Sequence, residues 1–221
     1  DRRQRQMCIR DRSNTLQGTV EVTVKANTTY QPREGAVVVK SGTTRVSVPV
    51  SQEAKPDIVD PDIDTPEGYR LIWQDEFNDS KLSTPDESLW WYETGASGWG
   101  NNEIQNYIPG SKNGETCAQV SNGTLKIIAK KVGNEVYSIR MNTVESWKYG
   151  YFEARLKLPT GKGTWPAFWM MPKNYTAWPD DGEIDIMEEV GYDPNVILST
   201  VHCKAYNHSI GTQKSGTIKV P

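Results

Sequence analysis

The stretch Asp181-Gly-Glu183-Ile-Asp185-Ile-Met-Glu188-Glu189 decides how the second half of this 221-residue chain is interpreted. Alternate side chains of a β-strand share a face, so Glu183 and Asp185 point one way and the neighbouring isoleucines point the other. Strict alternation would bury Glu188 beside those isoleucines, where an unpaired carboxylate costs several kcal/mol. One extra residue in the strand, a β-bulge near Ile186–Met187, would return Glu188 to the face of the other acids. We therefore expect three acidic side chains in a row on one surface.

The surrounding sequence predicts an all-β structure. From Tyr69 onward, short alternating segments are separated by Gly- and Asn-rich turns, and no convincing helix is present. The clearest segments are a turn and strand over 120–128 and strands over 149–158, 183–188 and 197–202. A side-chain period of about two, with turns at intervals of roughly 8–12 residues, is typical of a β-sandwich.

The N-terminal part differs in composition. Residues 14–53 alternate valines with polar residues around Val20–Val24, Ala36–Val39 and Val46–Val50, with turn chemistry at Ser41-Gly42. This pattern predicts part of a small antiparallel sandwich, too short to close a core alone. Residues 54–68 combine Pro56, Pro61 and Pro66 with closely spaced acids, which predicts an extended linker.

Residues 1–13 include five arginines and show no apolar periodicity. We interpret them as a disordered tail or a sequence scar and exclude them from the fold argument.

The composition narrows the classes of function. The net charge of −3 argues against a nucleic-acid partner, and no apolar run approaches the roughly 18 residues of a transmembrane segment. Eight Trp and ten Tyr against three Phe favour a wet surface that stacks on flat partners such as sugar rings. The chain has Cys8, Cys117 and Cys203, and the sequence leaves open whether the last two are bridged.

Three like charges on one face repel, so a structural protein gains nothing by collecting them. A glycosidase, by contrast, needs carboxyl groups close together on one face, because a pair of them carries out the hydrolysis. With the bulge, the Cα atoms of Glu183 and Glu188 lie about 13 Å apart, and convergent rotamers bring the carboxyls to the roughly 5–5.5 Å of a retaining pair. Asp185 lies between them, where it can hydrogen-bond a neighbour and hold one proton. A solvated acidic strand edge is the structural alternative.

The region from Leu71 to the end resembles family 16 glycoside hydrolases. The similarity rests on the Glu-x-Asp-x-x-Glu signature, in the bulged form typical of laminarinases, and on four further segments: Trp73-Gln-Asp-Glu-Phe77, Gly98-Trp-Gly-Asn-Asn-Glu103, Tyr149-Gly-Tyr-Phe-Glu-Ala-Arg155 and Gly163-Thr-Trp-Pro-Ala-Phe-Trp169. The resemblance implies a jelly-roll β-sandwich with the catalytic strand in a concave cleft. It also implies that Glu183 is the nucleophile, Asp185 the assisting acid and Glu188 the acid/base.

The resemblance also implies a polysaccharide substrate. Trp165 and Trp169 are four apart, so in a strand they would share a face and form a stacking platform. Trp99, Asn101 and Glu103 are expected to line sugar subsites, and His202 matches a position near the cleft. For Trp169 the alternative to a subsite is a place in the hydrophobic core, and for His202 the alternative is a purely structural role. We assign no role to His208.

The resemblance implies that the enzyme requires no cofactor. Many members of the family bind a structural calcium, and the matching positions here are Glu76 and Gly123.

Residues 14–53 resemble the end of an immunoglobulin-like BACON module, through Asn27-Thr-Thr, Arg33-x-Gly-Ala and the valine run. This arrangement is typical of secreted, periplasmic or surface-attached modular enzymes. The oligomeric state is not readable from the sequence.

Residues 69–221 are shorter than a usual family 16 domain, so we expect the C-terminal strands of the jelly roll to be missing and the isolated piece to be unstable. The leading functional hypothesis is an endo-β-1,3-glucanase that retains anomeric configuration. The alternatives are the same fold acting on mixed-linkage β-glucan or a galactan such as agarose, and a catalytically inactive glucan-binding protein.

Overall fold

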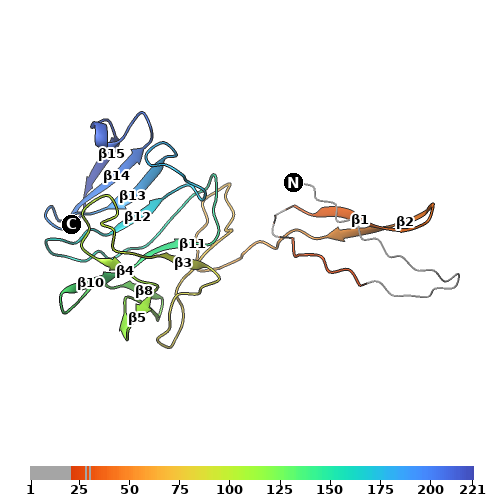
Figure 1. Cartoon of the computed structure of the whole chain (residues 1–221), viewed down its shortest axis with the longest axis horizontal. Helices are drawn as coiled ribbons and strands as arrows, with labels where there is room; N and C mark the ends of the chain where they lie inside the picture. The colour runs from red at the N-terminus through yellow and green to blue at the C-terminus, as the bar shows by residue number, and fades with distance from the viewer. Residues whose placement is uncertain (1–20, 28, 30) are drawn as a thin grey trace. The chain divides into compact units, whose positions relative to one another are not determined.

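The computed structural model describes residues 21–27, 29 and 31–221, and these residues form an all-β structure (Figure 1). The chain divides into two compact units. One ends at Lys81 and includes Ser121–Thr124, and the other comprises Leu82–Val120 and Leu125–Pro221. The boundaries predicted at 53/54 and 68/69 stay predictions, and the prediction for residues 1–13 lies outside the described residues.

The first unit contains a β-hairpin of β1 (Arg33–Ser41) and β2 (Thr44–Gln52). The valines favour extended backbone, and Gly42 supplies the left-handed conformation of the turn, with φ of 58°. The hairpin at Ser41-Gly42 is therefore confirmed. The strand expected around Val22 and Val24 is wrong, because residues 21–27 are not in a strand and pair with none of the described strands. Val20 lies outside the described residues.

The chain also forms several small sheets. β3 pairs with β11, β5 with β6 and β7 with β8, while β4, β10 and β9 form a three-stranded sheet in which β4 and β10 run parallel. The strand bounds are β3 Trp90–Glu93, β4 Asn106–Tyr107, β5 Ser111–Lys112, β6 Glu115–Thr116, β7 Ala118–Ser121, β8 Thr124–Ile127, β9 Lys130–Val132, β10 Glu135–Ser138 and β11 Arg140–Thr143.

The largest sheet has four antiparallel strands in the order β12-β13-β14-β15 (blue in Figure 1). These are Ala167–Met170, Glu183–Glu188, Val196–His202 and Lys214–Lys219, with a short 3₁₀ helix η1 (His208–Ile210) between the last two. The sheet includes the acidic segment and therefore positions the candidate site.

The register of β13 contains the predicted bulge. On β14, Asp185 pairs with Thr200 and Glu188 with Leu198, so three steps along β13 match two steps along β14. On β12, Phe168 pairs with Met187 and Trp169 with Asp185, which leaves Ile186 as the extra residue. The expected bulge at Ile186–Met187 is confirmed.

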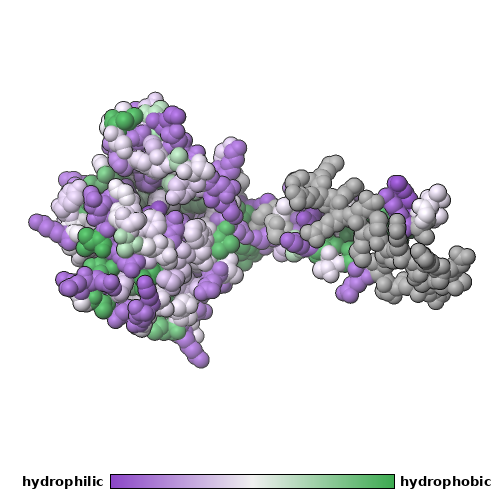
Figure 2. All heavy atoms as spheres, in the orientation of Figure 1, coloured by the Kyte–Doolittle hydropathy of each residue, from purple (hydrophilic) through white to green (hydrophobic). Residues whose placement is uncertain are grey.

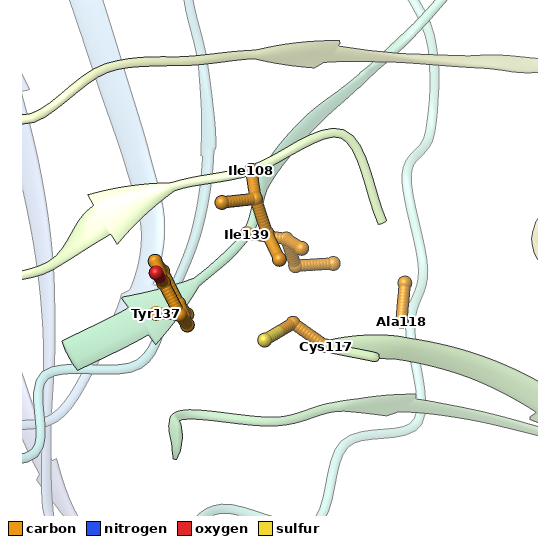
Figure 3. Close-up of a cluster of buried hydrophobic side chains, with 5 residues drawn as sticks. All are labelled: Ile108, Cys117, Ala118, Tyr137 and Ile139. Atoms are coloured by element: carbon orange, nitrogen blue, oxygen red, sulfur yellow. The ribbon is translucent and has the colours of Figure 1, made fainter. Parts of the chain in front are cut away.

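The core of the second unit lies under the small sheets. Ile108, Cys117, Ala118, Tyr137 and Ile139 form a buried cluster (Figure 3). Tyr92 and Met141 pack against this cluster. Cys117 and Cys203 are both free, so no disulfide joins them.

The face of the four-stranded sheet opposite the acids is apolar and open. Ile184 pairs with Val201, and both are nearly half exposed, while Ile218 on β15 is 67% exposed. The isoleucine before the bulge thus points away from the acids, as expected. In the view of Figure 2, hydrophilic residues dominate the visible surface and hydrophobic residues form separate patches.

The strand predicted over 149–158 is wrong. These residues carry no β-ladder, and Tyr149, Tyr151 and Leu156 are exposed. Alternation specifies which side chains share a face, but a strand also requires a hydrogen-bonding neighbour, and none of the described strands pairs with this segment. Across the described residues, no helix has the length and apolar character needed to cross a membrane.

Candidate active site

The bulge brings the three acidic residues of β13 to one face. Glu183, Asp185 and Glu188 lie opposite His202, Thr200 and Leu198. These three partners alternate along β14 and therefore share one face of it. The sequence-based expectation of three acids on one surface is thus met by the backbone register, although their catalytic roles stay predictions.

Asp185 is the most buried of the three acids, with 4% of its surface exposed. Burial, then the charges of Glu183 and Glu188, and then a hydrogen bond with Glu183 raise the pKa of Asp185 to about 8. At neutral pH this carboxyl is therefore protonated and can donate to the Glu183 carboxylate. The group predicted to hold one proton within the cluster has the environment to do so.

His202 adjoins Asp185. Its Nε2 lies 3.3 Å from Asp185 Oδ2, and the side chain is buried. Burial lowers the pKa of His202, against an opposing effect of the charge on Glu183. A neutral imidazole with its proton on Nε2 fits this contact, because Nδ1 has no hydrogen-bond partner among the described residues.

Each of the two glutamates accepts a hydrogen bond from an indole. Trp165 Nε1 donates to Glu188 Oε1 at 2.9 Å, and Trp178 Nε1 donates to Glu183 Oε2. Burial raises the pKa of Glu188, the charge on Glu183 raises it further, and the Trp165 bond opposes both. Glu188 is thereby biased toward its protonated form while Trp165 keeps its carboxyl in place.

Trp165 and Trp169 occupy different places from those predicted. The premise that both lie in one strand is wrong, because β12 begins at Ala167. Trp165 binds Glu188 from the preceding loop, whereas Trp169 lies opposite Asp185 in the ladder.

Arg140 joins Trp169 to Trp99. Its guanidinium carbon lies 4.4 Å from the Trp169 ring centroid and 4.6 Å from the Trp99 ring centroid, and its Nε forms an ion pair with Glu93. A cation over both rings fixes their orientation. The structure therefore brings these two predicted subsite residues together beside the acids.

The loop that carries Trp99 is held by its own side chains. Asn101 Nδ2 donates to Glu103 Oε1 at 3.3 Å, and Tyr107 Oη donates to Glu103 Oε2 at 2.7 Å. Trp99 itself has a φ of 48° and donates to the Gly95 carbonyl at 3.3 Å. Glu103 thus braces the loop, and the exposed Asn101 is the residue of this pair that remains open to solvent.

Sequence reasoning missed three residues of the site. Trp178 binds Glu183, and the ring of His208 lies 4.7 Å from the Trp178 ring and 5.4 Å from the His202 ring. Arg140 organises the tryptophans from β11. For Trp178, the sequence offered one signal, its position close to the acidic segment. For Arg140 and His208, the sequence offered no signal of a role in the site.

The predicted calcium residues lie in the first unit. Gly123 donates its N–H to the Phe77 carbonyl at 2.9 Å and has a φ of 74°. A side chain there would come within 3.8 Å of the Glu76 carbonyl and 3.6 Å of Asn78 Oδ1. Calcium takes about six to eight oxygen ligands, so these groups would supply only part of a site. The described residues contain no group of three or more His, Cys, Asp or Glu side chains placed to hold a metal.

Comparison with known proteins agrees with this geometry. A model of glycosyl hydrolases family 16 matches residues 105–219, and a BACON model, described as a putative N-terminal binding domain, matches residues 9–53. A β-glucanase from Rhodothermus marinus is 48% identical over 162 residues, covering 69% of this chain and 55% of the relative. A glucan endo-1,3-β-glucosidase from Cryptopygus antarcticus is 41% identical, covering 68% and 57%.

Solved structures show the same fold. SCLam, a non-specific endo-β-1,3(4)-glucanase, superposes with a TM-score of 0.64 at 42% identity, covering 72% of this chain and 62% of that one. The neighbours include family 16 laminarinases, which are jelly-roll sandwiches, so the predicted fold class is confirmed. The chain spans about half the length of the curated relatives it matches. Because the family model covers just over half of the chain, including the acidic strand, the chain belongs to glycosyl hydrolases family 16.

Proposed function

We propose that this chain forms the catalytic part of a retaining glycoside hydrolase that cleaves β-1,3-glucan by double displacement, in the manner of an endo-β-1,3-glucanase. The register shift of β13 is the observation that carries the proposal, because it puts Glu183, Asp185 and Glu188 on one face. In a strand without the bulge, Glu188 would point to the opposite face from Glu183 and Asp185. Glu183 and Glu188 could then not act on the same glycosidic bond.

In this mechanism Glu183 is the nucleophile. Its carboxylate attacks the anomeric carbon as the glycosidic C–O bond breaks, and Glu188 gives its proton to the leaving oxygen. Glu188 then removes a proton from water, which attacks the anomeric carbon and releases Glu183. Two inversions at one carbon retain the configuration of the sugar.

The electrostatics support this division of roles. Burial raises the pKa of Glu188 and the charge on Glu183 adds to the rise, which favours the acid form needed for the first step. Forming the glycosyl ester removes that charge and lowers the pKa of Glu188, which favours the base form needed for the second. Asp185 has a pKa of about 8, so its carboxyl keeps a proton that it can donate to Glu183. His202 contacts Oδ2 of the same carboxyl and helps to hold it in place.

The substrate assignment rests on the relatives and on the aromatic lining of the site. The two relatives named above are a β-glucanase and a glucan endo-1,3-β-glucosidase, and SCLam is described as acting on β-1,3(4)-glucan. Trp165, Trp169 and Trp99 offer flat surfaces to a neutral polysaccharide, and Asn101 offers an amide to its hydroxyls. We extend the proposal to a secreted or surface-attached enzyme, in keeping with the BACON match, and to a structural calcium at Glu76 and Gly123.

Reducing-end release from laminarin, lichenan and agarose tests the substrate. The proposal predicts the highest kcat/KM on laminarin, and a preference for lichenan or agarose would select mixed-linkage glucan or galactan instead. Glu183→Gln should lower kcat by at least about 10³-fold and leave the thermal midpoint unchanged. Glu87→Gln changes an exposed glutamate of the same unit and should have no effect. Tight glucan binding by the unmutated protein without any product would identify a binding protein and contradict the proposal.

A further inference from the structure

The strand pair β3–β11 has one core face and one open face. Tyr92 and Met141, which pair across the strands, pack against the buried cluster. Alternation therefore puts the next pairs, Glu93 with Arg140 and Trp91 with Asn142, on the opposite face. Trp91 thus does not belong to the core of this unit.

That open face is continuous with the face that carries the acids. The Arg140 guanidinium lies over the Trp169 ring, and Trp169 pairs with Asp185 in the main sheet. Beyond the ends of the strands, Lys173 Nζ donates to the Val144 carbonyl at 3.4 Å, which ties the end of β12 to the end of β11. Trp91, two residues before Glu93, extends the surface that begins at the candidate catalytic residues.

Trp91 is held in a fixed position with its ring accessible. Its indole N–H donates to the Thr143 carbonyl at 3.2 Å, and 48% of the residue is exposed. Anchoring the polar atom of an indole to the backbone leaves the apolar ring as the part that meets solvent.

We infer that Trp91 is an additional sugar-stacking subsite, distant from the bond that is cut, which binds a glucosyl ring of the same neutral glucan chain. The inference rests on the proposed function and deepens it. A long glucan that crosses from the acids over Trp169 and Arg140 reaches Trp91, whereas a short oligosaccharide ends before it. The chain-length preference of the enzyme therefore depends on this residue.

Trp91→Ala and Trp91→Phe test the subsite on a series of β-1,3-gluco-oligosaccharides and on laminarin, with turnover and calorimetric binding both measured. Loss of one stacked ring should raise Kd and KM for laminarin and the long oligosaccharides by roughly two- to tenfold. kcat and all constants for the shortest cleaved oligosaccharide should stay unchanged, and Phe should retain most of the affinity. Ile218→Ala, which removes an exposed apolar side chain on the opposite face of the main sheet, is the matched control and should change nothing.

Two results would overturn the subsite. One is unchanged constants on long substrates. The other is an equal loss on short and long substrates with a lowered thermal midpoint, which would make Trp91 a packing residue.

If the unmutated protein cleaves laminarin and Trp91→Ala behaves identically, the subsite alone fails. If the unmutated protein neither binds nor cleaves glucan, the proposed function fails and the subsite with it. If it binds long glucan without cleavage and Trp91→Ala weakens that binding, the subsite holds and the catalytic proposal fails.

Discussion

The Trp165 indole donates to Glu188 Oε1 at 2.9 Å, from a loop outside the strand that carries the acid. Trp178, in the segment between β12 and β13, makes the equivalent contact with Glu183. The two glutamates therefore have distinct indole partners, and each partner can be removed without touching the other. This separation allows the proposed roles of acid/base and nucleophile to be tested independently.

Trp165→Phe should move the basic limb of the pH profile of kcat/KM to higher pH. The Trp165 bond lowers the pKa of Glu188, so its loss leaves burial and the charge on Glu183 to raise that pKa further. A general acid works while it is protonated, so a higher pKa extends activity toward higher pH. The measurement is kcat/KM on laminarin across the pH range.

Trp91→Phe is the control for this shift, because Trp91 bonds the Thr143 carbonyl and not an acid. Its basic limb should coincide with that of the unmutated protein. A basic limb that stays in place in Trp165→Phe would show that the group titrating there is not Glu188.

Asp185→Asn should flatten the dependence of stability on pH. The unfolded carboxyl titrates near 3.8 and the folded one near 8, so between these values the folded state keeps a proton that the unfolded chain has released. The free energy of unfolding therefore falls as pH rises from about 4 to 8, by at most about 1.4 kcal/mol per pH unit from this group. Urea unfolding at several pH values measures the slope, and an equally steep slope in the Asn variant would rule out Asp185 as its source.

His208→Ala should lower kcat several-fold with little change in KM, because the His208 ring packs against Trp178 at 4.7 Å and Trp178 holds Glu183. Loss of the ring frees the indole and, through it, the nucleophile. His208→Phe restores an aromatic contact without a titratable group and should recover most of the rate. Equal loss in both variants would show that stacking on Trp178 is not what His208 contributes.

The bulge and the acidic face could be predicted from the sequence because a local rule decides them. Strict alternation would put Glu188 on the side of Ile184, so one extra residue is needed to return it to the side of Glu183 and Asp185. The hairpin at Ser41-Gly42 was predictable for the same reason, since Gly42 fits the positive φ of the turn.

Features that depend on a distant partner could not be predicted. The alternation over 149–158 is real, but whether it becomes a strand depends on a neighbour that the segment does not specify. The position of Trp165 depended on where β12 begins, and strand ends are weakly encoded. Arg140 reaches Trp99 and Trp169 only after β11 is placed beside the main sheet, and no spacing in the sequence indicates that contact.

The anomeric configuration of the first product tests the central claim most directly. Proton NMR of laminarin hydrolysis, recorded before mutarotation, shows whether the new reducing end forms as the β- or the α-anomer. A Glu183–Glu188 pair on one face of a bulged strand, acting by double displacement, predicts the β-anomer from the β-linked substrate. Initial formation of the α-anomer would mean that water attacks directly, and it would contradict the role given to Glu183.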